Sequence, residues 1–237
     1  MAKKLDVSIL EKYKGLRVTD VCDGMDALGM QDIGLVDREI HPLWRDIENF
    51  THRVYGLAHT VRFVPTNRKK PDYKPEGFDD FKKWGYGLAK GPFTDQIKKG
   101  DMIVIDGEET GSVGYIGSNN AFSWIAAGAV GVVTNGGCRD TDELIKQKVP
   151  VYSRYINRTI RPGRLELDTT NVQLNIGGAL VRPGDLVVAD GDGVVVVPAE
   201  VAEEVCKWAW HVADDDKEGR KKIYEKLGRP LDWTVKG

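Results

Sequence analysis

Between residues 100 and 154 the chain alternates short apolar runs with helix-like segments, and this alternation constrains its fold most strongly. The apolar runs at 102–105, 130–133 and 149–154 predict buried strands. Between them, 120–131 and 140–148 have the composition of helices. Strands separated by helices pair in parallel through crossover connections, so this part of the chain predicts an α/β fold.

The pattern changes in the segment 171–198, NVQLNIGGALVRPGDLVVADGDGVVVVP. Its short strands are interrupted by the turn sequences GG, RPGD and DGDG, which are typical of antiparallel hairpins. DGDG also resembles part of a calcium-binding loop, but the rest of that spacing is missing, so a β-turn is the better interpretation. The sequence thus predicts a mixed sheet with parallel and antiparallel strands.

Helical extensions are expected at both ends of this sheet. Residues 1–30 predict a helix, a turn and a second helix that Thr19 could cap, and 199–228 predicts one or two amphipathic helices. A strand is expected at 54–64, followed by a long loop at 65–93. Loops of that length in compact domains are usually functional or partly disordered. No clean linker interrupts the pattern, so one domain is expected over 1–237.

Composition excludes several classes of protein. The 237 residues carry a formal net charge of -2, so no strong positive field favours nucleic acid or anionic lipid. No apolar run approaches the roughly 20 residues that span a bilayer, and the start lacks a signal-peptide core. The three cysteines form no CxxC pair, which disfavours disulfides and structural zinc. A cytoplasmic setting is expected.

The most specific local motif is NGGCRD at 135–140, directly after a predicted buried strand. Ligands of open α/β sheets bind at the carboxyl ends of strands. Gly136 and Gly137 would allow a tight turn and a close approach to a ligand. Arg139 offers a planar fork for a carboxylate or 2-oxo acid, and Asp140 offers oxygen ligands for magnesium or manganese. Alone, an Arg-Asp pair in a surface turn is the commoner outcome.

A second motif, GYIGSNNAF at 114–122, also stands between a strand and a helix. Gly117, Ser118, Asn119 and Asn120 would place backbone amides at a helix N-terminus, where anions bind. Simple helix capping explains this motif equally well when it is taken alone. Together, the two motifs suit a 2-oxo acid that chelates a metal, with the metal stabilising an enolate oxygen.

These segments resemble a known family. Residues 116–140, followed by PVYSR at 150–154 and RPGDLVVADGDGVVVVP at 182–198, are similar to the family named for the regulator of ribonuclease activity A. It includes 4-hydroxy-4-methyl-2-oxoglutarate aldolases and oxaloacetate decarboxylases. The resemblance extends from about Thr19 to the C-terminal helix. It implies a swivelling α/β/β domain, assembled as a homotrimer or homohexamer with active sites between subunits.

The resemblance also implies roles for individual residues. Asp140 would hold Mg²⁺ or Mn²⁺, largely through waters, and Arg139 would contact the substrate oxo group and stabilise the enolate. Backbone amides of Gly117, Ser118, Asn119 and Asn120 would bind the substrate carboxylate. A lysine Schiff base is not needed in this scheme.

Three departures from the family pattern bear on the substrate. The glycine loop reads Gly-Ser-Asn-Asn, whereas many aldolase members carry an acidic residue there, so weaker metal binding or another substrate is expected. A carboxylate from a neighbouring subunit completes the aldolase site, and Glu218 is the candidate here, with Asp215 and Asp216 as alternatives. The long 65–93 segment could form a lid over a larger, sugar-acid-derived substrate.

The sequence therefore predicts a metal-dependent carbon–carbon lyase of the pyruvate-aldolase or oxaloacetate-decarboxylase type. The alternative is a non-catalytic regulator that binds a ribonuclease or another protein. A methyltransferase, a label attached to some relatives, is disfavoured because no glycine-rich loop suits S-adenosylmethionine.

Overall fold

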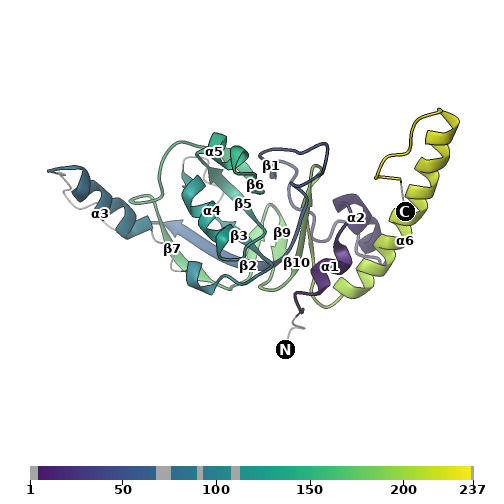
Figure 1. Ribbon diagram of the computed structural model, residues 1–237. Coiled ribbons are helices and arrows are strands. Elements are labelled where there is room, and N and C mark those ends of the chain that lie inside the picture. The colour runs from purple at the N-terminus through teal and green to yellow at the C-terminus, as the bar shows by residue number, and fades with distance from the viewer. Residues whose placement is uncertain (1–4, 68–75, 90–92, 108–112, 236–237) are drawn as a thin grey trace.

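The computed structural model describes residues 5–67, 76–89, 93–107 and 113–235 (Figure 1). Its main sheet has nine strands, in the order β1-β6-β5-β3-β2-β10-β11, with β4 paired to β5 and β7 paired to β2. These strands are β1 His41–Pro42, β2 Val54–Pro65, β3 Asp101–Asp106, β4 Gly114–Ile116, β5 Gly131–Cys138, β6 Val151–Ile156, β7 Leu165–Thr170, β10 Leu186–Asp190 and β11 Gly193–Val197. A separate hairpin pairs β8 Leu174–Ile176 with β9 Ala179–Val181.

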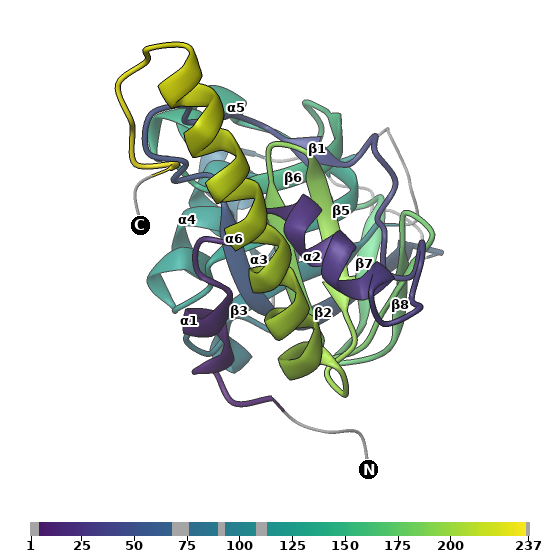
Figure 2. The same ribbon diagram turned by 90° about the vertical axis from the view of Figure 1, so that its right-hand side faces the viewer.

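The helices lie in two groups around the sheet. In Figures 1 and 2, α1, α2 and α6 lie beside β10 and β11, whereas α4 and α5 lie beside β3 and β5. The helices are α1 Ile9–Tyr13, α2 Val18–Asp26, α3 Phe78–Ala89, α4 Ser118–Ala126, α5 Thr141–Lys146 and α6 Ala202–Lys226, with a 3₁₀ turn, η1, at Thr94–Gln96. Within the described ranges, no helix is both long and apolar enough to cross a membrane.

The mixed α/β architecture predicted from the sequence is confirmed. Strands β2, β3, β5 and β6 pair in parallel, and β10 pairs antiparallel with both β11 and β2. The DGDG segment forms the tight turn between β10 and β11, as predicted, with Asp190 opposite Gly193.

Hydrogen bonds from the segment before β1 nearly close the sheet. Val196 donates its amide to the carbonyl of Gly34 over 2.9 Å, and Val36 donates to Val194 over 3.2 Å. Only glycine fits at position 34, because its φ is +74° and a Cβ there would lie 1.9 Å from the Val196 carbonyl oxygen. This contact ties the β11 edge of the sheet to the chain that leads into β1.

Three buried apolar clusters hold the layers together. In β10 and β11, alternate residues such as Val188 and Val195 pack against α1, α2 and α6. Their neighbours, such as Val187 and Val194, face the interior of the nearly closed sheet. A third cluster joins β3 and β5 to α4 and α5, with Trp124 among its members. Successive residues of a strand point to opposite faces of the sheet, and both faces of these strands are buried. Their sequences are therefore almost wholly apolar.

Two local predictions differ from the structure. Residues 65–93 are not one loop, since α3 occupies 78–89 and projects from the body in Figure 1. The stretches 68–75 and 90–92 and the side chains of 84–89 lie outside the described part, so the lid stays a prediction. The C-terminal segment, by contrast, agrees with the prediction of one or two helices, because it forms one 25-residue helix, α6.

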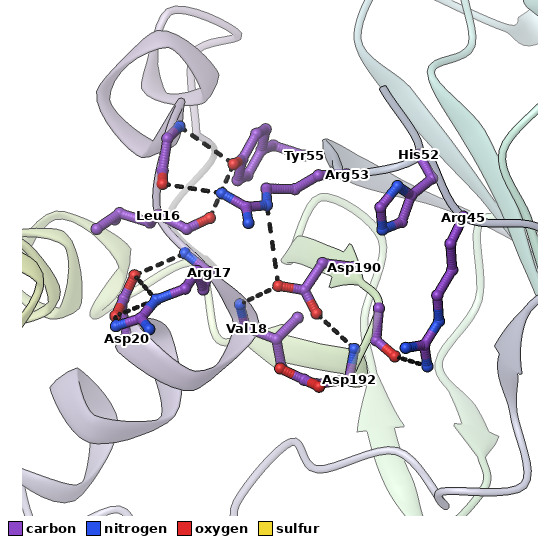
Figure 3. Close-up of polar contacts among 12 residues, drawn as sticks. Leu16, Arg17, Val18, Asp20, Arg45, His52, Arg53, Tyr55, Asp190 and Asp192 are labelled. Carbon is purple, nitrogen blue, oxygen red and sulfur yellow. Dashed lines mark hydrogen bonds and ion pairs between the residues drawn. The ribbon is translucent and has the colours of Figure 1, made fainter. Parts of the chain in front are cut away.

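Thr19 does not cap α2, which begins one residue earlier, at Val18. Asp20 accepts from the Arg17 amide over 2.8 Å and pairs with the Arg17 guanidinium. The Val18 amide donates to Asp190 Oδ2 over 2.9 Å, as Figure 3 shows. A local partner, Asp20, satisfies the Arg17 amide, whereas the Val18 amide depends on Asp190 from a distant part of the chain, which a local motif could not reveal.

Candidate active site

The two sequence motifs meet at the carboxyl end of β5. A cavity of about 140 Å³ is lined by residues of β4, the start of α4, the end of β5 and the segment after β6. The lining residues are Gly114, Tyr115, Gly117, Asn119, Asn120, Arg139, Asp140, Ile160, Arg161 and Pro162. Five of the six predicted site residues outside α6 therefore line one cavity. Ser118 is buried beside it.

Asp140 follows β5 and stands at the N-cap position of α5 in the left-handed conformation, with φ +56° and ψ +43°. Aspartate tolerates this conformation better than most residues. Its carboxylate makes no capping hydrogen bond to α5. Instead, Oδ2 accepts from the Ser118 amide of α4 over 3.2 Å. The left-handed turn thus directs the carboxylate away from its own helix and toward the neighbouring one.

Arg139 is fastened at its backbone, because its amide donates to the Ile116 carbonyl of β4 over 2.8 Å. Its Nε donates to Asp140 Oδ1 over 3.2 Å, a single-point contact. The Arg139 and Asp140 side chains are 31% and 34% exposed, so both remain accessible from the cavity. The guanidinium keeps donors for a further acceptor because it carries five N–H groups.

The N-terminus of α4 opens into the same cavity. Gly117 is its N-cap residue, and the amides of the first helical residues have no acceptor within a helix. A Cβ at Gly117 would lie 2.7 Å from Asp140 Oδ2. The absence of a side chain at 117 therefore lets the carboxylate approach the start of α4.

The glycine pair has a different role from the one predicted. Gly136 and Gly137 belong to β5, which continues to Cys138, and both are buried. A Cβ at Gly136 would lie 1.9 Å from the Tyr115 hydroxyl, and one at Gly137 would lie 2.5 Å from the Val113 carbonyl. These glycines accommodate β4 and Tyr115 rather than a ligand, so the prediction of a ligand-binding turn is wrong.

Two lining residues with polar side chains, Tyr115 and Arg161, were not among the predicted site residues. Tyr115 is fixed by a 2.5 Å hydrogen bond between its hydroxyl and that of Thr134, and burial raises the pKa of the phenol. Arg161 is buried, with its guanidinium carbon 4.5 Å from the centroid of the Phe63 ring. Desolvation lowers the pKa of Arg161 to about 10, so it stays charged at neutral pH. The one sequence signal for Arg161 was its position after the carboxyl end of β6.

Glu218 lies elsewhere within the protomer. It is an exposed residue of α6, which packs with α2 beside β10 and β11, apart from α4 and α5 (Figure 1). Asp216 is engaged in its own chain, because its Oδ2 pairs with Arg17 Nη2 at 2.6 Å and Arg220 Nη1 at 3.4 Å. Among the alternatives to Glu218, Asp215 is exposed.

Asp140 is not part of a preassembled metal cage. In the described residues, no three histidine, cysteine, aspartate or glutamate side chains gather as a metal-binding group. Any metal at this site would therefore depend on one carboxylate from the protomer, together with other ligands.

Comparisons with known proteins agree with this architecture. The family model described as RraA-like, Aldolase/RraA, matches residues 18–196. A protein of Halalkalibacterium halodurans, provisionally named 4-hydroxy-4-methyl-2-oxoglutarate aldolase, is 30% identical over 223 residues, which cover 94% of this chain and 91% of that protein. For three other curated relatives the chain spans only 29%, 59% and 62% of their lengths.

Solved structures show the same fold. An uncharacterised protein from Pseudomonas syringae pv. tomato has a TM-score of 0.73 at 26% identity, covering 99% of this chain and 100% of that one. RraAS2 of Streptomyces coelicolor, described as an unusual member of the RNase ES inhibitor RraA family, has a TM-score of 0.71 at 23% identity, covering 92% and 98%.

Proposed function

Because this chain belongs to the RraA-like family, we propose that it is a divalent-metal-dependent lyase acting on a small 2-oxo acid. The reaction is carbon–carbon cleavage of the pyruvate-aldolase type or decarboxylation, through an enolate. One observation carries the proposal: the Asp140 carboxylate, the Arg139 guanidinium and the N-terminus of α4 meet in a single cavity. The names of relatives such as the Halalkalibacterium protein support the same class of reaction.

The donor set at Asp140 fits Mg²⁺ or Mn²⁺. Each carboxylate oxygen accepts one hydrogen bond, from the Ser118 amide or from Arg139 Nε, so each keeps a lone pair for a metal. Magnesium commonly keeps several waters and takes only one or two protein carboxylates together with substrate oxygens. A site with one carboxylate and an adjoining cavity suits this mode of coordination.

The substrate carboxylate would bind at the start of α4. The amides of Asn119 and Asn120 belong to the first helical turn, whose N–H groups and dipole favour an anion. Asn119 and Asn120 also line the cavity, so the anion would lie within reach of Asp140 and Arg139. This arrangement orients the substrate with its keto oxygen toward Arg139.

Arg139 would stabilise the charge that develops on the keto oxygen as the carbon–carbon bond breaks. Its backbone is held by the contact to Ile116 and its Nε by Asp140, so little reorganisation is needed. A dication at Asp140, when bound, would act as a Lewis acid on the same oxygen.

A second subunit would complete the site. The cavity of one protomer is small and has a single described carboxylate, Asp140. We propose that Glu218 of α6 reaches it from a neighbouring copy in a homotrimer or homohexamer, with Asp215 as the remaining alternative. Asp216 is the weaker candidate because its own chain pairs it with Arg17.

The test is pyruvate release from a panel of 4-hydroxy-2-oxo acids and from oxaloacetate, with Mg²⁺ or Mn²⁺. We expect turnover that chelation abolishes, and a loss of about 100-fold in Arg139→Lys, since a point charge cannot replace the planar fork. No turnover with the whole panel contradicts the proposal. Binding of a ribonuclease by wild type and Asp140→Asn alike would then favour the regulator.

A further inference from the structure

A much larger cleft lies at the opposite end of the parallel strands. It has a volume of about 900 Å³, within the range of small-molecule sites. It borders the amino ends of β2, β3 and β5, whereas Asp140 follows the carboxyl end of β5. The eight residues of β5 separate the two sites by roughly 25 Å. The cleft is therefore distinct from the proposed active site.

The floor of this cleft is apolar. It includes Val7 and Leu10 beside α1, Ile125 and Ala129 near the end of α4, and Val130 before β5. Glycines 15, 100 and 128 contribute backbone without side chains. Such a surface favours the apolar body of a ligand over a fully hydrated ion.

One wall of the cleft is aromatic. The rings of Phe50 and Trp233 meet edge to face, with centroids 4.9 Å apart and an interplanar angle of 63°. Trp233 Nε1 donates to the Glu48 carbonyl over 3.2 Å, which anchors the C-terminal segment to the 46–53 loop. Two edge-to-face rings present a surface suited to a further planar ring.

The loop holds Phe50 in an unfavourable backbone conformation. Its φ is +53°, a region that bulky residues rarely occupy. Asp46 fixes the loop by accepting from the Glu48 amide over 3.0 Å, the Asn49 amide over 3.1 Å and the Thr51 hydroxyl over 2.7 Å. A strained residue that the surroundings hold in place is typical of functional sites.

The cleft is positively charged in an acidic chain. Lys14, Lys99 and Arg53 line it with one carboxylate, Glu11, which lies 3.9 Å from Lys14. Arg53 also lies 3.9 Å from the buried carboxylate of Asp190, so three cations face two anions. The chain as a whole has a formal net charge of -2. Local cation excess at an apolar cleft complements an anionic ligand.

Arg53 is the most buried of these cations. Its side chain is 16% exposed, and its Nη1 donates to the Gly15 carbonyl over 3.1 Å. Its Nε is buried without a hydrogen-bond partner and lies 3.9 Å from the buried carboxylate of Asp190 (Figure 3). Its guanidinium carbon lies 5.1 Å from the Phe50 ring centroid, so charge and aromatic wall adjoin.

We propose that this cleft binds a small aromatic anion, with its ring beside Phe50 and Trp233 and its acidic group near Arg53, Lys14 and Lys99. The ligand class is an aromatic ring that carries one carboxylate, sulfonate or phosphate. This site is additional to the proposed lyase site, and its ligand does not take part in that reaction.

The probe is 8-anilinonaphthalene-1-sulfonate, followed by its fluorescence on binding to the full chain. Its uncharged analogue, N-phenyl-1-naphthylamine, shares the ring system and lacks the sulfonate. We expect saturable binding of one sulfonate probe per chain, at least about tenfold tighter than the analogue. Equal affinities for the two probes would show a merely apolar surface and overturn the proposal.

Variants locate the probe. Phe50→Gly removes the ring and suits the positive φ, so the fold is retained while binding weakens by about tenfold. The double variant Lys14→Glu/Lys99→Glu reverses two exposed charges and should weaken binding by about tenfold, whereas Lys146→Glu on α5 is the matched control and should not. Circular dichroism checks that each variant folds.

Three further results would overturn the proposal. Phe50→Gly could bind the probe as wild type does. Asp140→Asn could abolish binding, which would place the probe at the carboxyl-end cavity instead. Wild type could fail to bind the probe at all. That result is expected if another copy of the chain covers the cleft, and light scattering would reveal such an oligomer.

Discussion

The two ends of the parallel strands carry different kinds of site. At the carboxyl end, a cavity of about 140 Å³ is built from charged side chains and helix amides that lie on adjacent connections of the sheet. At the amino end, a cleft of about 900 Å³ is assembled from α1, the 46–53 loop and the C-terminal segment. β5 borders both. One end is organised for polar chemistry at a few atoms, and the other for enclosing an apolar body.

Backbone conformation is used differently at the two ends. At the carboxyl end, Gly117 and Gly136 remove side chains so that Asp140 and Tyr115 can approach the backbone. At the amino end, Phe50 keeps its ring despite a positive φ. Both ends also combine glycines with one non-glycine residue at positive φ, which is Asp140 at the carboxyl end and Phe50 at the amino end. The comparison teaches that the carboxyl end uses a residue type that tolerates this conformation, whereas the amino end holds a bulky ring that does not.

The largest expected effect is a loss of turnover in Asp140→Asn that leaves probe binding at the other end unchanged. Asp140→Asn keeps a residue that tolerates the left-handed conformation and removes the charge, so kcat should fall about 10³-fold. Binding of the naphthalene sulfonate at the amino end should not change. The measurements are steady-state kinetics with Mn²⁺ and probe fluorescence on the same preparation. Loss of both turnover and probe binding in this variant would show that the two ends are not independent.

The next effect concerns stability at the carboxyl end. Gly136→Ala would place a Cβ 1.9 Å from the Tyr115 hydroxyl, inside a buried strand. Overpacking of this kind costs about 3 kcal/mol, so Tm should fall by roughly 6–12 °C.

Gly219→Ala is the matched control for this change. A Cβ there meets no atom within 4 Å, and position 219 lies in α6. Since alanine favours a helix by up to about 1 kcal/mol over glycine, Tm should rise slightly. Equal Tm values for the two variants would refute the proposed packing role of Gly136.

A smaller effect should appear in catalysis without a large loss of stability. Gly117→Ala would bring a Cβ within 2.7 Å of Asp140 Oδ2, and the carboxylate can move away. A displacement of a few tenths of an ångström should lower kcat about tenfold, while Tm changes by only a few degrees. Unchanged kcat would mean that the position of Asp140 against α4 is not important for the reaction.

The smallest effect concerns acid sensitivity at the amino end. Hydrogen bonds from Thr51 and from loop amides hold the pKa of Asp46 well below its usual range. Because the pKa of Asp46 is lower in the folded state than its unfolded value near 3.9, the ionised carboxylate stabilises the loop fully above that pH. This stabilisation is lost as the pH falls from there toward the folded-state pKa. Probe binding should therefore weaken below about pH 4, and Asp46→Ala should show weak binding already at pH 7. An identical pH profile in both proteins would contradict this role.

Much of the carboxyl end could be predicted from sequence. The strand–helix alternation fixed where strands end, so Arg139 and Asp140 were expected near residues 117–120, and the cavity contains both groups. The role of Gly136 was not predictable, because it depends on Tyr115 of another strand reaching the same point. The prediction of one domain over 1–237 and the assignment of Glu218 to a neighbouring subunit stay predictions.

The amino-end cleft could not have been predicted. Its wall joins Phe50 to Trp233, which are 183 positions apart, and its charge depends on Arg53 being held by Asp190. The start of α2 was misassigned for the same reason, since Asp190 satisfies the Val18 amide from another part of the chain. Local patterns give elements and motifs, whereas contacts between distant segments need the folded chain.

The central claim is that the Asp140 carboxylate holds a divalent cation. The most direct test is titration of Mn²⁺ into the protein with pyruvate present, with free Mn²⁺ followed by electron paramagnetic resonance. We predict one Mn²⁺ per chain in wild type and at least about 10-fold weaker binding in Asp140→Asn. Equal binding by the two proteins would contradict the account.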